Sequence, residues 1–101
     1  MDARYSDIEI IQLLGDRFRQ YRIALGLTQA ELSAKAGVSK MTIHKFESGT
    51  AGNVSMQTLL ALLRYTGLLK NADALIPDIP ESPYSPLSNR KRVRHGNKAQ
   101  Q

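Results

Sequence analysis

The side chains best suited to chemistry gather between positions 40 and 45. Lys40, Met41, His44 and Lys45 fall at helical positions i, i+1, i+4 and i+5, so they share one face of a helix. Lys donates to guanine O6 and N7, Met contacts a thymine methyl group, and His donates or accepts according to its protonation. This face predicts contacts to base edges in the major groove of DNA.

Other chemistries lack the residues they need. The chain has no Cys, and its only imidazoles are His44 and His95. These exclude a disulfide framework, a thiolate site and a multi-His metal centre within one chain. No nucleophile with a partner base accompanies His44. We therefore expect no enzyme activity, no metal and no cofactor.

Composition points to the same class of partner. A chain of 101 residues provides one domain at most, and its formal net charge is +5. Residues 17–45 carry six Lys and Arg against Glu31 alone. The longest apolar run, Leu59–Leu63, is far shorter than the ~20 residues of a membrane span, and no signal peptide is recognisable. We expect a soluble, cytoplasmic protein with nucleic acid as its first partner to test.

Two short helices joined by a tight turn must position the face from Lys40 to Lys45. Thr28 and Glu31 have capping-box spacing, which starts the first helix, and Gly37 ends it. Ser39 then caps the second helix. Two helices connected so closely must cross steeply, as in a helix-turn-helix. The alternative is an ordinary helical hairpin in a bundle.

The rest of the first 75 residues also has helical periodicity. One apolar stripe begins after a Ser6–Glu9 capping box, although Gly15 leaves open whether this helix is continuous; the stripe comprises Ile11, Leu14, Phe18, Tyr21 and Leu25. Ser55 caps a Leu-rich helix over residues 56–66, and a short helix is expected at Asn71–Leu75. The predicted fold is all-α, with four to five helices and no strand.

A change in composition divides the chain near Ile76. We predict a folded domain at 1–75 and a disordered tail at 76–101, first Pro-rich and then basic. The prolines recur every third residue from Pro77 to Pro86, which suits an extended polyproline segment. The tail is a solubilising end, a partner-binding strip, or a basic segment that attracts DNA through Arg90–Lys98.

Leucines in the fourth helix cover too much of its circumference for a single core stripe. Core burial accounts for about half of the set at 59, 60, 62 and 63. The remainder predicts a second apolar surface, most economically a twofold dimer interface that contains Leu60, Leu63, Leu68 and Leu69. A dimer would place two reading helices in successive major grooves of a palindromic operator.

The motifs from Leu14 to Leu69 resemble those of the Xre family of bacterial and phage helix-turn-helix regulators, which includes Cro and the phage repressors. The matching stretches are Leu-Gly-Asp-Arg-Phe-Arg-Gln-Tyr-Arg, Gly-Leu-Thr-Gln-Ala-Glu-Leu, Gly-Val-Ser and Ile-His-Lys-Phe-Glu-Ser-Gly. The resemblance implies a lambda-repressor-like bundle and a sequence-specific DNA-binding repressor, nucleoid-associated when bound.

The resemblance also assigns roles to single residues. It implies base reading by Lys40, Met41 and Lys45, and an ion pair between Arg22 and Glu47. The expected phosphate contacts are Gln29, Ser39 and Thr42 at the starts of the two helices, and Asn53 in the loop after them. Arg17 and Arg19 either contact phosphate as well or form an ordinary solvated helix face.

The C-terminal end of the match is similar to HipB-type antitoxins, which repress their own operon and bind a HipA-like kinase toxin. The similarity rests on Gly67-Leu68-Leu69, Asn71–Pro77 and the Pro-rich, basic tail. It implies an autorepressing antitoxin with a protein toxin as a partner. The alternatives are a stand-alone phage-type repressor and a protein-interaction module whose DNA binding is incidental.

Overall fold

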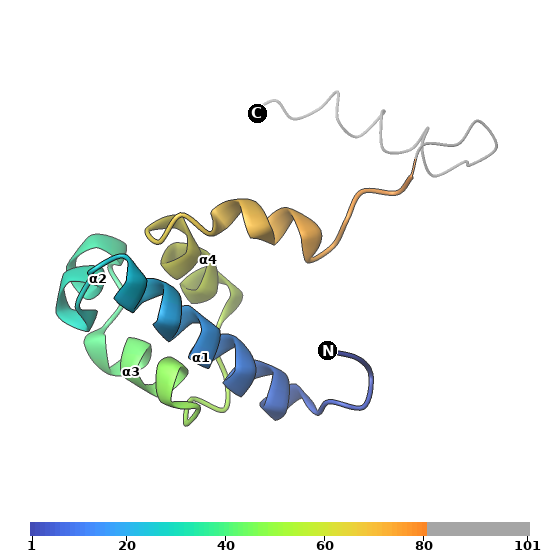
Figure 1. The fold of residues 1–101 in the computed structure, drawn as a ribbon, viewed down its shortest axis with the longest axis horizontal. Coiled ribbons are helices and arrows are strands. Elements are labelled where there is room, and N and C mark those ends of the chain that lie inside the picture. Colours follow the sequence, from blue (N-terminus) through green and yellow to red (C-terminus); the bar gives the residue numbers. More distant parts are fainter. Residues whose placement is uncertain (81–101) are drawn as a thin grey trace.

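The structure is a computed structural model that describes residues 1–80, and these residues form helices and no strand (Figure 1). The elements are α1 (Asp7–Ala24), α2 (Gln29–Ala36), α3 (Lys40–Ser48), α4 (Met56–Arg64) and a 3-10 helix, η1 (Leu69–Ala74). The predicted all-α class is confirmed. The predicted tail lies outside the described residues from position 81 onward.

Local sequence signals account for where the helices begin. Both predicted capping boxes are present: the Glu9 amide donates to Ser6 Oγ at 3.1 Å, and the Glu31 amide donates to Thr28 Oγ1 at 3.0 Å. Each Glu carboxylate in turn accepts from the backbone of its cap residue. Side-chain oxygens cap all four α-helices, at Ser6, Thr28, Ser39 and Ser55. Such a cap stabilises a helix by about 1 kcal/mol.

The core lies where the four α-helices meet. Its buried residues come from every one of them: Phe18, Leu32, Ile43, Phe46 and Leu62. The rings of Phe18 and Phe46 lie 5.7 Å apart, centroid to centroid, and join α1 to α3. Val38, in the turn between α2 and α3, packs against this cluster. The core therefore fixes α3 by its inner face.

Helix α1 is continuous through Gly15. The absence of a side chain at this position allows α1 to pack closely against α3. A Cβ atom built on Gly15 would collide with the backbone carbonyl of Phe46 in α3. The glycine thus lets the two helices approach backbone to backbone. Its cost to helix stability, roughly 1 kcal/mol relative to Ala, is offset by this contact.

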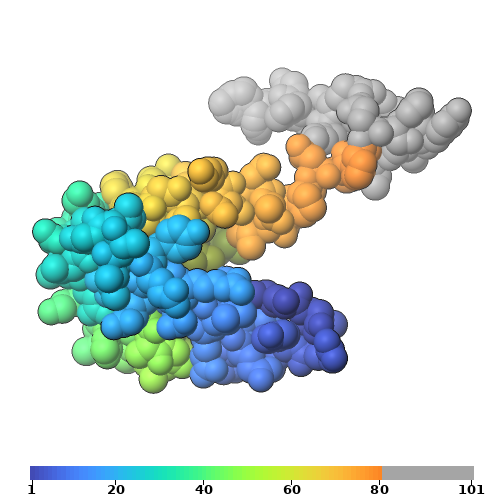
Figure 2. All heavy atoms as spheres, viewed as in Figure 1, coloured from blue at the N-terminus to red at the C-terminus, as the bar shows by residue number. Residues whose placement is uncertain are grey.

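The predicted apolar stripe of α1 does not reach the core along its whole length. Ile11, Leu14 and Phe18 pack into the core, but Tyr21 and Leu25 are 54% and 53% exposed. Helix η1 packs against α4 and is not close-packed on α1, and Tyr21 lines a pocket between α1 and η1. The surface is hollowed between α1 and η1 (Figure 2).

Among residues 1–80, no helix combines the length and the apolar character required to cross a membrane.

Candidate nucleic-acid interface

The connection between α2 and α3 is a three-residue turn. Gly37 ends α2 in the left-handed region, with φ 70° and ψ 27°, and its amide donates to the Ser33 carbonyl. Val38 follows and Ser39 caps α3. A residue with a Cβ atom is strained at such a positive φ, so glycine suits the point where the chain turns. The predicted helix-turn-helix geometry is present.

Helix α3 has one buried face and one exposed face. Ile43, Phe46 and Glu47 are buried on the inner face. The four residues predicted to read bases are exposed on the rest of the surface: Lys40, Met41, His44 and Lys45. Met41 is 60% exposed, which leaves its side chain available for contact with a ligand. No hydrogen bond or ion pair within residues 1–80 occupies the side-chain nitrogens of the two lysines.

A buried ion pair holds α3 against α1. Arg22 Nε donates to Glu47 Oε2 at 2.7 Å, and Arg22 Nη2 donates to Oε1 at 2.8 Å, so the pair is bidentate. Arg22 Nη1 also donates to the Leu27 carbonyl at 2.7 Å. The hydrogen bonds to Glu47 raise the pKa of Arg22 further above its ordinary value. The pair is buried and joins α1 to α3.

Gln29 extends this network to α2. Its Nε2 donates to Glu47 Oε1 at 3.1 Å, and the side chain is half-buried. Sequence reasoning placed Gln29 at the DNA backbone and did not foresee this bond. The amide has a second N–H, so the bond orients the group and leaves one donor available. Three helices are thereby tied together through one carboxylate.

Two hydroxyl groups mark the N-terminus of α3. Ser39 Oγ accepts from the Thr42 amide at 3.1 Å, and the two side-chain hydroxyls share a hydrogen bond of 2.8 Å. Helix N-termini favour anions because their first amides lack partners within the helix. The structure thus brings Ser39 and Thr42 together beside Lys40 and Met41.

The remaining predicted phosphate contacts separate into two groups. Asn53 is exposed in the loop between α3 and α4. Gln12 of α1 faces the end of α3, because its Nε2 donates to the Gly49 carbonyl. Arg19 is seven residues, or about two helical turns, further along α1 and therefore lies on the same side of that helix as Gln12. Arg17 lies elsewhere: it lines a pocket formed with α4 and η1.

The leucines predicted to form a dimer interface are half-buried within one chain. Leu63 and Leu68 line the pocket between α1 and η1, and Leu68 also packs against the core. Leu60 and Leu69 are not among the pocket-lining residues. The four leucines therefore do not all line the same part of the surface. The dimer stays a prediction.

Two residues that support the interface carried no functional signal in the sequence. Gly15 allows α1 to contact α3 closely, and Gln12 ties the loop after α3 to α1 through Gly49. Both contacts join residues more than thirty positions apart.

No group of three or more metal-ligating side chains occurs in the described part of the chain.

Comparison with known families agrees with this geometry. A family model described as a helix-turn-helix domain matches residues 13–75, which is more than half of the chain. The match includes the turn, the whole of α3 and the ion pair that holds it. The chain belongs to this helix-turn-helix domain family and has the fold of a DNA-binding regulator.

Proposed function

We propose that this protein is a sequence-specific transcriptional repressor of the Xre type that reads DNA with the exposed face of α3. The observation that carries the proposal is the contrast between the two faces of that helix. The inner face is fixed by buried Ile43 and Phe46 and by the Arg22–Glu47 pair, while Lys40, Met41, His44 and Lys45 are exposed. A rigid helix with free polar and basic groups suits base contact in the major groove.

Phosphate contacts would set the orientation of α3 on the duplex. Ser39 and Thr42 present hydroxyl groups at its N-terminus, and Gln29 at the start of α2 has one N–H left. Asn53 and Arg19, both exposed, are further proposed phosphate contacts. Such contacts supply affinity and register, while the side chains on α3 supply sequence discrimination. Repression follows from occlusion of promoter DNA and requires no chemical step.

A dimer would double the reading surface. Two copies related by a twofold axis would place their α3 helices about 34 Å apart, one helical turn of DNA. Leu60 and Leu69 are the predicted interface residues that do not line the pocket. The proposed target is therefore a palindromic operator.

The finer role that we propose is that of an antitoxin that represses its own operon and binds a HipA-like kinase toxin. This rests on the resemblance of the Gly67–Pro77 stretch and of the Pro-rich, basic tail. The tail beyond residue 80 lies outside the described residues. An adjacent reading frame for a kinase-like toxin would support the antitoxin role, and its absence would favour a stand-alone repressor.

The direct test removes the two lysines from the reading face. An operator is first selected from random-sequence DNA with the wild-type protein. In Lys40→Ala/Lys45→Ala, the free energy of operator binding should weaken by about 1–3 kcal/mol for each specific contact, and the ratio to scrambled DNA should fall. The measurement is a fluorescence-anisotropy titration at fixed salt.

The control is Lys70→Ala, which removes an exposed positive charge from η1, away from α3. It should lower affinity for operator and scrambled DNA alike, if it has any effect. Equal discrimination by the double variant and the wild type would rule out α3 as the reading helix.

A further inference from the structure

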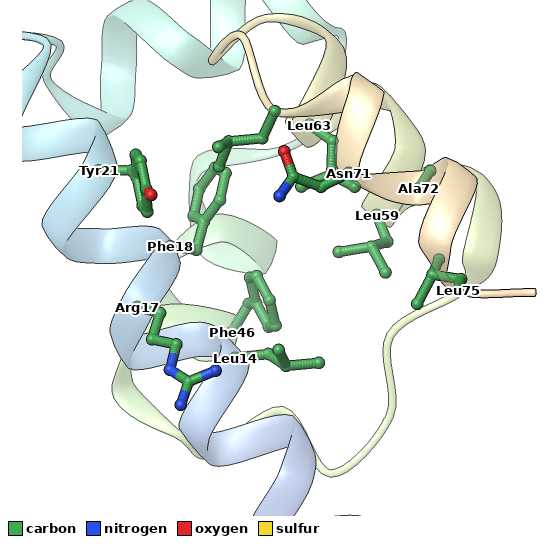
Figure 3. A pocket seen from close by; sticks show the side chains of 11 residues that line it. Leu14, Arg17, Phe18, Tyr21, Phe46, Leu59, Leu63, Asn71, Ala72 and Leu75 are labelled. Atoms are coloured by element: carbon green, nitrogen blue, oxygen red, sulfur yellow. The ribbon is translucent and has the colours of Figure 1, made fainter. Parts of the chain in front are cut away.

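A pocket of about 340 Å³ lies on the side of α1 opposite its contact with the loop after α3. We call it the α1–η1 pocket (Figure 3). Its apolar lining comes from three α-helices and from η1 with its flanks, and the larger side chains include Leu14, Phe18, Phe46, Leu59, Leu63 and Leu75. Small-ligand pockets typically have volumes of roughly 300–1,000 Å³ and mostly apolar walls with a few polar groups. The α1–η1 pocket has the size and the lining for a small ligand.

Three polar side chains also line this pocket, and none has a partner there. Arg17 and Tyr21 come from α1, and Asn71 comes from η1 (Figure 3). None of the three makes a side-chain hydrogen bond or ion pair within residues 1–80. Arg17 is the one charged residue among those that line the pocket in the described part of the chain. The charge of the pocket is therefore positive.

We propose that the α1–η1 pocket binds a small amphipathic carboxylate. The apolar body of the ligand occupies the space between the leucines and Phe18, and the carboxylate accepts hydrogen bonds from the Arg17 guanidinium. The positive charge selects an anion over a cation of the same shape, and the planar guanidinium pairs with carboxylate in two parallel hydrogen bonds.

Binding would connect two elements that do not otherwise pack together. Helix α1 carries Arg17, whereas η1 carries Asn71 and is attached to the rest of the fold through α4. A ligand held between them fixes the position of η1 relative to α1. Leu63 and Leu68 line the same pocket and belong to the predicted dimer surface. The ligand is thus placed to change self-association without touching the exposed face of α3.

The test uses the full chain and sodium octanoate as the probe, with octylammonium as a ligand of equal length and opposite charge. Leucine methyl resonances at positions 59, 63 and 68 are followed by NMR during each titration. Octanoate should shift these resonances saturably, and octylammonium should bind at least about tenfold more weakly. Arg17→Gln should weaken octanoate binding by about fivefold.

The matched control is Arg19→Gln, which removes the same charge from the same helix at a position that does not line the pocket. It should leave octanoate affinity within about twofold of the wild type. Equal affinity for octanoate and octylammonium, or equal losses in the two arginine variants, would overturn the proposal.

Two other occupants of the pocket would give distinct results. If the three methyl resonances shift with protein concentration alone and octanoate causes no further change, a second copy of the chain fills the pocket. If the methyl resonances of ligand-free Tyr84→Ala differ from those of the wild type, and octanoate does not bind the wild type, the chain's own C-terminal segment fills the pocket. Either result would overturn the carboxylate proposal.

Discussion

The two sides of α1 differ in how completely they are packed. On the side toward α3, a glycine contact, a glutamine-to-backbone bond and a buried ion pair join the helices. On the side toward η1, Tyr21 is half exposed and the α1–η1 pocket separates the elements. The first side positions the proposed DNA-reading face, which needs rigidity to keep base contacts in register. The second side has room for a ligand. Small shifts of η1 there cost less free energy than shifts of α3 on the first side, because fewer packed contacts are lost.

Breaking the ion pair on the closed side should have the largest effect. Arg22→Met leaves the Glu47 carboxylate buried without its partner, and the loss of unfolding free energy should be about 3–5 kcal/mol. Urea denaturation followed by circular dichroism measures it. Arg19→Met, an exposed change on the same helix, should shift stability by no more than about 0.5 kcal/mol. Similar losses in the two variants would mean that the pair does not hold α3.

The contrast between the two sides can be tested with the same substitution on each. Leu62 is fully buried in the core, whereas Leu75 lines the α1–η1 pocket and is 56% exposed. Leu62→Ala should lose about 2–5 kcal/mol, because the change leaves a cavity in a packed site. Leu75→Ala should lose about 0.5 kcal/mol or less. Equal losses, measured by urea denaturation, would show that the η1 side is as tightly packed as the core.

The smallest expected effect is a pH dependence at the start of α2. The Thr28 backbone amide donates to the Glu31 carboxylate, which holds the pKa of Glu31 below its ordinary value of 4.5. A carboxyl group whose pKa is lower in the folded state stabilises the fold above its unfolded pKa. That stabilisation is lost as the pH falls through the folded pKa.

Glu31→Gln should therefore reduce the loss of stability on acidification from neutral pH to about pH 3. The measurement is the urea midpoint of each protein at a series of pH values. Parallel curves for the wild type and Glu31→Gln would show that this cap does not contribute to the acid sensitivity of the domain.

Much of the fold follows from local sequence patterns. The caps at Ser6, Thr28, Ser39 and Ser55, and the turn at Gly37, depend on residues within three or four positions, so spacing alone predicts them. The exposed face of α3 follows from helical periodicity in the same way. The pairing of Arg22 with Glu47 came from the family resemblance, because it joins residues 25 positions apart.

What sequence reasoning missed depends on how helices approach one another in space. Gly15 reads as a weak point in a helix until the Phe46 carbonyl is seen against it. Tyr21 continues an apolar stripe, yet it is exposed because η1 does not cover it. Helical periodicity identifies which residues share a face and does not say which neighbour, if any, covers that face.

The glycine contact between α1 and α3 has a consequence for how DNA specificity can change. The α1 backbone lies against the Phe46 carbonyl, and this close approach restricts how α3 can rotate or slide relative to α1. The angle at which its outer side chains meet a duplex is therefore set by the scaffold. New operator preferences can then arise through single replacements at positions 40, 41, 44 and 45, each of which inherits the same docking geometry.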